Sequence, residues 1–170
     1  GGEAGLHPSN LHDNAYAIGA LDFTGDMPVI LGPDGPSLGG FVCPATIVQA
    51  ELWKMGQLRP GDTVRFRRLS QAQAERMELA QDAVIASLAA PAAPALVADS
   101  EPLAEPVLHR TPETDNPVAV VYRRAGDKYL LVEYGPLVLD LNLRFRVHAL
   151  MTRLKADAVP GILDLTPGIR

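Results

Sequence analysis

The sequence predicts a β-rich α+β protein, because short apolar runs of strand length alternate with glycine- and proline-rich turns and only a few segments have helical periodicity. Strand-like runs fill most of residues 1–68 and recur in residues 118–170. Ala, Pro and acidic residues dominate residues 89–117, a composition typical of a linker. We therefore expect two β-rich units, connected by a helix at residues 69–88 and a linker at residues 89–117.

The first unit, residues 1–68, is expected to be a curved sheet with one short helix. Residues 28–31 are an apolar run between two turn signals, and residues 41–43 begin another such run. The apolar spacing within residues 45–54 predicts a one-sided helix. Residues 63–67 alternate polar and apolar side chains, as a half-buried strand does. This order of elements predicts a closed or strongly curved sheet.

The clearest helix start lies at Ser70, which opens a capping-box pattern completed by Gln73. An apolar stripe continues from there to about Leu88. Proline breaks up the segment that follows, so we expect no regular element to propagate through residues 89–117. The prolines concerned are Pro91, Pro94, Pro102, Pro106, Pro112 and Pro117.

The second unit, residues 118–170, is predicted to have the order β-β-α-β. Residues 118–122 and 128–134 are strand-like and flank a turn, so they should form a hairpin. Asp140 can cap the helix that follows, and residues 162–165 resemble a final strand. The residues expected on the buried face of that helix are Leu143, Val147, Leu150, Met151 and Leu154. Because so small a sheet needs further strands to bury its face, we expect this unit to be truncated.

Composition excludes several classes of function. The net charge of −5 and the 47% hydrophobic content indicate a folded, soluble protein without the basic surface of a nucleic-acid binder. The apolar run at residues 83–98 is too short, and too interrupted by proline, to span a membrane. Cys43 is the only cysteine and cannot form an internal disulfide, which favours a cytoplasmic location. The histidines are scattered, so we expect no metal site.

A polar cluster near the N-terminus is the strongest candidate for a site. His12 is a potential base, Asp13 a carboxylate, Asn14 an amide that both donates and accepts, and Tyr16 a phenol. The alternative is a β-turn in which Asp13 and Asn14 satisfy backbone amides and His12 is solvated. Consecutive residues of a strand point to opposite faces, so at most alternate members of the cluster share a pocket unless the backbone is irregular there.

A glycine-rich segment, residues 32–40, is the second candidate. It lacks the Lys-Ser/Thr pair of a phosphate loop, which argues against nucleotide binding. Gly39 and Gly40 could present backbone amides to a developing oxyanion, although a wide turn between strands explains the same glycines. Asp22 and Asp26 could pair as acid and base, although Gly25-Asp26 is also an ordinary turn signal.

The motifs of both units resemble a known family. In the first unit these motifs are GLHPSN (5–10), HDNAYAIG (12–19), FTGD (23–26), GPDGPSLGGFVCP (32–44) and QLRPGD (57–62). In the second unit they are YLLVEYG (129–135), LDLNLR (139–144) and PGILDLTP (160–167). Together they resemble the carboxyltransferase region of urea carboxylase, also called urea amidolyase, with the end of its first half followed by the start of its second half.

This resemblance implies cyclophilin-like β-barrels and a chain that is a fragment of a longer, ATP- and biotin-dependent ligase. A biotin carboxylase domain would use ATP and bicarbonate, and a carrier domain would hold biotin covalently; both would be partners of this chain. The implied reaction transfers the carboxyl group of carboxybiotin to urea and gives allophanate. The fragment alone should have little or no activity.

The resemblance also gives the candidate residues roles. His12, Asp13 and Asn14 are implied as catalytic, and the residues implied to bind substrate are Tyr16, Asp26, Ser37, Gly39 and Gly40. Which of them is the base stays open, as do the oligomeric state and the presence of a fused allophanate hydrolase. Paired 5-oxoprolinase subunits and a regulatory module of the same superfamily remain alternatives, since they share LRPGD (58–62) and the double glycine but lack HPSN and HDNAYAIG.

Overall fold

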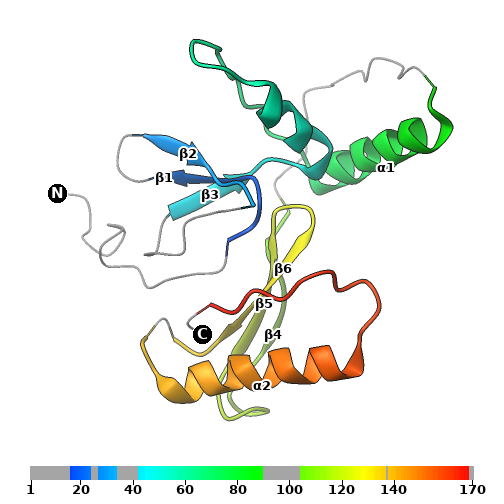
Figure 1. Ribbon diagram of the computed structural model, residues 1–170. Helices are drawn as coiled ribbons and strands as arrows, with labels where there is room; N and C mark the ends of the chain where they lie inside the picture. Colours follow the sequence, from blue (N-terminus) through cyan, green and yellow to red (C-terminus); the bar gives the residue numbers. More distant parts are fainter. Residues whose placement is uncertain (1–15, 24–26, 34–41, 90–103, 137, 169–170) are drawn as a thin grey trace.

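A computed structural model of the chain describes residues 16–23, 27–33, 42–89, 104–136 and 138–168, and the structural statements below concern these residues. They form two three-stranded antiparallel sheets with helices beside them, so the predicted α+β class is confirmed (Figure 1). The first sheet has the order β2-β1-β3 and the second the order β4-β5-β6. Within the described ranges, no helix is long and apolar enough to cross a membrane.

The first sheet is built around β1, Ala20–Phe23, which pairs with β2, Pro28–Ile30, on one side and with β3, Val42–Thr46, on the other. The register between β1 and β3 shifts between Leu21 and Phe23, which marks a bulge or irregularity. A bulge increases the local twist of a sheet, as a curved sheet requires. Closure of this sheet into a barrel stays an expectation.

Two helices follow the first sheet. The 3-10 helix η3, Gln49–Gln57, packs against α1, Gln71–Ser87. The prediction for α1 is confirmed, because the Ser70 hydroxyl accepts a hydrogen bond from the backbone N–H of Gln73. Leu88 ends the helix in a left-handed conformation.

Two predictions for the first unit are wrong. The helix expected at residues 45–54 starts only at Gln49, because the Ile47 N–H donates to the Gly19 carbonyl and keeps the chain extended through β3. The strand expected at residues 63–67 is not formed, and Val64 and Phe66 are exposed. Alternating polar and apolar residues predict which face of a strand would be buried, but a strand forms only where a neighbouring strand pairs with it.

The second sheet consists of β4, Val107–Thr111, β5, Val120–Ala125, and β6, Tyr129–Tyr134. Pairing of β5 with β6 confirms the predicted hairpin. The strand β4 lies inside the predicted linker, so the expectation of no regular element there is wrong. Pro106 and Pro112 flank β4, and proline at the ends of a strand removes no hydrogen bond from its interior.

The helix α2, Leu141–Asp157, lies along the second sheet in Figure 1. Asp140 caps it by accepting from the Asn142 N–H at 2.7 Å, as predicted. Leu143 is buried, and its side chain lies beside Gly135. The final strand predicted at residues 162–165 is absent, so the order of the unit is β-β-β-α. Arg144 instead donates from Nη1 to the Gly168 carbonyl at 2.6 Å, which ties this segment to α2.

Candidate functional site

A cavity of about 340 Å³ lies where the first sheet meets the β5–β6 hairpin. The first unit contributes the loop before β1, β1 itself and β3, and the second unit contributes the hairpin and the entrance to β4. Its lining residues are Tyr16, Ala17, Ala20, Cys43, Pro44, Ala45, Thr46, Pro106, Arg124, Ala125, Gly126 and Leu131. The cavity is therefore composed of residues from both units.

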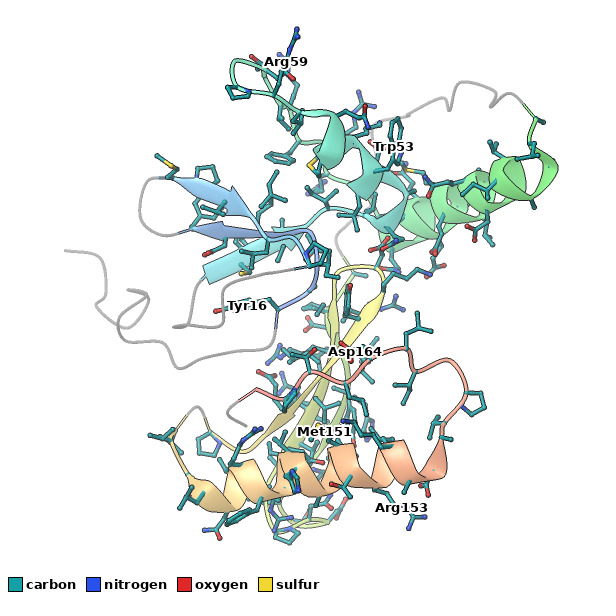
Figure 2. The ribbon with its side chains drawn as sticks, in the orientation of Figure 1. Tyr16, Trp53, Arg59, Met151, Arg153 and Asp164 are labelled. Carbon is teal, nitrogen blue, oxygen red and sulfur yellow. The ribbon has the colours of Figure 1, made fainter. Side chains whose placement is uncertain are left out.

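The lining has the chemistry of a small-molecule site. Most of its side chains are small and apolar, whereas Tyr16, Thr46, Cys43 and Arg124 carry polar groups. A mostly apolar cavity of a few hundred Å³ with few polar groups is typical of sites that bind small organic ligands. In Figure 2, Tyr16 lies on the segment that leads into β1.

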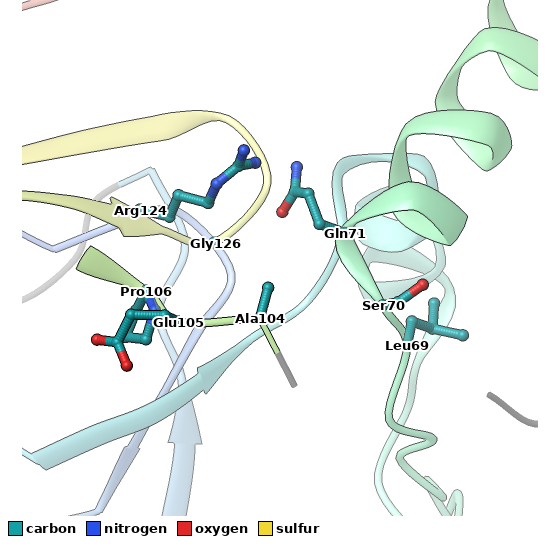
Figure 3. Close-up of a pocket in the computed structure, with 8 residues that line it drawn as sticks. All are labelled: Leu69, Ser70, Gln71, Ala104, Glu105, Pro106, Arg124 and Gly126. Carbon is teal, nitrogen blue, oxygen red and sulfur yellow. The ribbon is translucent and has the colours of Figure 1, made fainter. Parts of the chain in front are cut away.

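A smaller cavity of about 200 Å³ adjoins the first and shares Pro106, Arg124 and Gly126 with it. The side chains of Arg124 and Gln71 extend toward each other from the hairpin and from the start of α1 (Figure 3). Oε1 of Glu75 accepts from Gln71 Nε2 at 3.1 Å and lies 3.8 Å from Arg124 Nη1. Polar groups of α1 and of the hairpin thus meet beside the larger cavity.

Asp22 is the buried polar residue of the first sheet. The residue is 2% exposed, and Oδ1 has no hydrogen-bond partner among the residues that the structure describes. Burial raises the pKa of this carboxyl above its ordinary value of 3.8, because the charged form loses its hydration.

Cys43 lies close enough to Asp22 to be affected by its charge. Burial, and secondly the negative charge of Asp22, raise the pKa of the Cys43 thiol to about 11. At neutral pH Cys43 is therefore a thiol rather than a thiolate, which makes it a poor nucleophile. Its side chain is part of the wall of the larger cavity.

Of the residues predicted for the site, the structure describes Tyr16 and Asp22: it places Tyr16 in the wall of the larger cavity, whereas Asp22 is buried in the first sheet and is not among the residues that line that cavity. The other candidates lie outside the described residues: His12, Asp13, Asn14, Asp26, Ser37, Gly39 and Gly40. Whether they meet at this cavity therefore stays a prediction. Among the described residues, no group of His, Cys, Asp and Glu side chains could hold a metal ion.

Sequence reasoning missed the contribution of the β5–β6 hairpin. The sequence predicts only a turn between the two strands of the hairpin, although Arg124 and Gly126 line both cavities. Thr46 was assigned to a helix and instead ends β3 beside that turn. A single sequence carries no signal for which distant turn docks against which strand, so these residues were not predictable.

The first unit of the chain is similar to a known family of domains. Residues 1–68 match the family described as carboxyltransferase domain, subdomain A and B. This match covers the first sheet and η3, and therefore the side of the larger cavity that contains Tyr16.

Relatives extend the match to the whole chain. The urea amidolyase of Lachancea kluyveri is 45% identical over 100% of this chain, which covers 10% of that protein. A putative urea carboxylase of Emericella nidulans is 44% identical over 99% of the chain and 15% of the relative. The crystal structure of the Kluyveromyces lactis urea carboxylase superposes with a TM-score of 0.81 at 46% identity, over 99% of this chain and 15% of the other.

The chain thus spans between a tenth and about a seventh of the length of these relatives. Along its whole length it is similar to a segment of the urea amidolyases and urea carboxylases, and the resemblance inferred from its motifs is confirmed.

Proposed function

We propose that this chain forms part of the carboxyltransferase of a biotin-dependent urea carboxylase. The observation that carries the proposal is the agreement of a carboxyltransferase family match at residues 1–68 with relatives named urea amidolyase and urea carboxylase along the whole chain. The activity would belong to the longer protein, with biotin on a carrier domain and with ATP and bicarbonate used at a biotin carboxylase domain. The two units would then be parts of the two carboxyltransferase halves, the first of them a cyclophilin-like barrel.

The proposed reaction sets the requirements for the site. Carboxybiotin would supply the carboxyl group. Its transfer to urea breaks the bond between the biotin nitrogen and the carboxyl carbon and forms a bond between a urea nitrogen and that carbon, which gives allophanate. Negative charge is left on the ureido oxygen of biotin. Hydrogen-bond donors are needed at that oxygen, and a base must accept the proton that the attacking urea nitrogen loses. Urea is small and neutral, so only hydrogen bonds can recognise it.

The candidate residues supply these groups. Asp13, with His12 beside it, would accept the proton or orient urea, and Asn14 and Tyr16 would hydrogen-bond urea and biotin. The backbone amides of Gly39 and Gly40 would donate to the ureido oxygen. Asp26 and Ser37 would complete the polar contacts with substrate. The larger cavity supports this proposal, since Tyr16 lines it and its volume of about 340 Å³ suits a small ring ligand.

The test uses a urea amidolyase in which this chain replaces the equivalent segment of the Kluyveromyces lactis enzyme, with which it shares 45% identity and a TM-score of 0.82. Asp13→Ala and Asn14→Ala should each lower urea-dependent carboxyl transfer by roughly a hundredfold or more, the usual contribution of a positioned acid–base group. Carboxylation of free biotin should be unchanged, because it occurs at another domain.

Asp115→Ala is the matched control, because Asp115 lies in an exposed turn where its carboxylate accepts from the Thr114 hydroxyl. This variant should transfer carboxyl groups at the rate of the unmodified chimera. Unchanged transfer in both Asp13→Ala and Asn14→Ala would remove these residues from the site. If the chimera turned over 5-oxoproline and not urea, the proposal of urea as the substrate would be wrong.

A further inference from the structure

The turn between β5 and β6 contacts several elements of the first unit. Arg124, near the end of β5, and Gly126, Asp127 and Lys128 of the turn are together called the latch below. They contact α1, β3 and the start of η3. These contacts join segments that are far apart in sequence, and Figure 1 shows the tip of the hairpin reaching toward the end of β3 and the start of α1.

Asp127 provides a helix cap from the opposite unit. Val48 precedes η3 and forms no side-chain cap. Oδ2 of Asp127 accepts from the Gln49 N–H at 2.8 Å and so satisfies one of the free N–H groups at the start of η3. A carboxylate is also favoured there by the partial positive charge of a helix N-terminus. The second unit thereby completes an element of the first.

Opposite charges flank this cap. Lys128 forms a close ion pair with Glu78 of α1, and Arg124 lies 3.8 Å from Glu75, one turn earlier on the same helix. The hydrogen bond to Glu78 is the main cause of a raised Lys128 pKa, and Asp127 and Asp82 add to it. The basic side of the latch therefore faces an acidic face of α1.

Gly126 allows the latch to approach β3 closely. Its φ is +71°, and a Cβ added there would lie 2.8 Å from Cγ2 and 3.1 Å from Cβ of Thr46. Distances this short require one of the two segments to move. Glycine therefore meets two needs at once, the left-handed backbone of the turn and contact with the strand.

The latch also forms part of the cavity wall. Arg124 and Gly126 line the larger cavity opposite Cys43 and Thr46 of β3. Among the described residues, the helices and strands of the two units do not pack broadly against each other; the main packing pairs lie within each unit. The polar contacts of the latch therefore fix the position of this wall of the cavity relative to the first unit.

We propose that the latch gates the larger cavity: docked on α1, η3 and β3 it completes a composite binding site, and released it opens the cavity between the two units. The inference concerns access to the same cavity but does not depend on carboxyl transfer. It rests on the contacts of the turn, on its share of the wall and on the limited packing elsewhere between the units.

Cys43 is a built-in reporter, because it is the only cysteine of the chain and lies in the cavity wall. The experiment measures its modification by methyl methanethiosulfonate, a small neutral reagent, at about pH 9, where more of the thiol is ionised. Lys128→Glu should raise the rate by roughly five- to tenfold, since repulsion by Glu78 replaces attraction. Lys128→Glu combined with Glu78→Lys should return the rate to within about twofold of the original, because the pair is restored with reversed charges.

Controls separate the latch from general effects of charge. Arg153→Glu breaks the exposed pair between Arg153 and Asp157 on α2 and should leave the Cys43 rate unchanged. In the unmodified protein, raising NaCl from about 0.05 M to about 0.5 M should speed modification by screening the pairs. The salt series needs no variant, so it tests the proposal even if a substituted chain fails to fold.

Gly126→Ala tests the close approach by a second route. It should speed Cys43 modification, whereas Gly161→Ala should not, because Gly161 has a similar φ of +89° with nothing within 4 Å of an added Cβ. Any of three results would overturn the proposal. The first is an equal Cys43 rate in Gly126→Ala and Gly161→Ala, and the second is a Cys43 rate that does not depend on salt. The third is a double variant, Lys128→Glu with Glu78→Lys, that does not restore the original rate. The assay contains no urea or biotin, so failure of the proposed function would not change its result.

Discussion

Replacing Asp22 by Asn is expected to stabilise the protein at neutral pH. Asp22 is 2% exposed, and within the described part of the chain its Oδ1 has no hydrogen-bond partner. An ionised carboxylate in such a place costs desolvation energy that no contact at Oδ1 offsets. Asparagine has nearly the same shape and no charge, so it removes the cost of the charge without leaving a cavity.

The magnitude follows from the burial of the group. Asparagine keeps an unpaired oxygen but carries no charge, so the free energy of unfolding should increase by on the order of 1 kcal/mol in Asp22→Asn at pH 7, the desolvation cost of the charge. Because burial raises the pKa of Asp22, the folded protein binds its proton more tightly than the unfolded chain does. The cost is therefore fully present above the folded pKa and disappears as pH falls through that value toward 3.8.

The assay is guanidinium denaturation of both proteins at pH 7 and at about pH 4.5, and the gain in Asp22→Asn should be smaller at the lower pH. Titration of the Cys43 thiolate by ultraviolet absorbance gives a second measurement. Its pKa of about 11 should fall in the variant, because the charge of Asp22 is lost, while burial should keep it above the ordinary value. Glu113→Gln, at an exposed position, serves as the control and should change neither result.

A loss of stability in Asp22→Asn at pH 7, or a gain that does not depend on pH, would refute this reasoning. The first outcome would mean that the carboxylate forms a favourable contact, and the second that the pKa of Asp22 is the same in the folded and unfolded states.

Gly19→Ala should lower the free energy of unfolding by at least about 2 kcal/mol, because φ is +86° and the added Cβ would lie 2.6 Å from Cδ2 of Leu52. Gly61→Ala, at φ +96° with open space around it, should cost only about 1 kcal/mol, so denaturation of the two variants separates the contact from the backbone strain. Ser70→Ala should cost about 1 kcal/mol and reduce hydrogen-exchange protection at the start of α1, because the cap to Gln73 is lost. Leu143→Ala should cost about 2–5 kcal/mol by thermal or chemical denaturation, because Leu143 is 3% exposed; a cost below about 1 kcal/mol would mean that α2 is not packed as described.

Local signals in the sequence predicted much of the fold. Ser70 and Asp140 mark helix starts because their side chains hydrogen-bond backbone groups a few residues ahead, a contact that depends on neighbouring residues alone. The β5–β6 hairpin was predictable for the same reason, since a short turn connects its strands. The errors occurred where a distant partner decided the outcome: β4 exists because β5 pairs with it, whereas the alternating residues 63–67 do not form a strand.

The candidate site divides in the same way. The motifs around Tyr16 predicted a site and the family resemblance, and the structure places Tyr16 in the cavity wall. Arg124 and Gly126 complete that wall from a turn more than a hundred residues away in the chain. Nothing near them in the sequence marks this role, because docking depends on the complementary charges of α1 and on the space beside Thr46.

By itself, then, the sequence determined the helix caps, the hairpin, the α+β class and the resemblance to urea carboxylases, all of which depend on neighbouring residues or on recognisable motifs. The tertiary structure alone decided that β4 pairs with β5, that Asp22 is buried with Oδ1 unpaired, and that the hairpin turn forms a wall of the cavity. The physical reason is that burial and close approach arise between residues far apart in the chain, and a local pattern does not specify which of them meet.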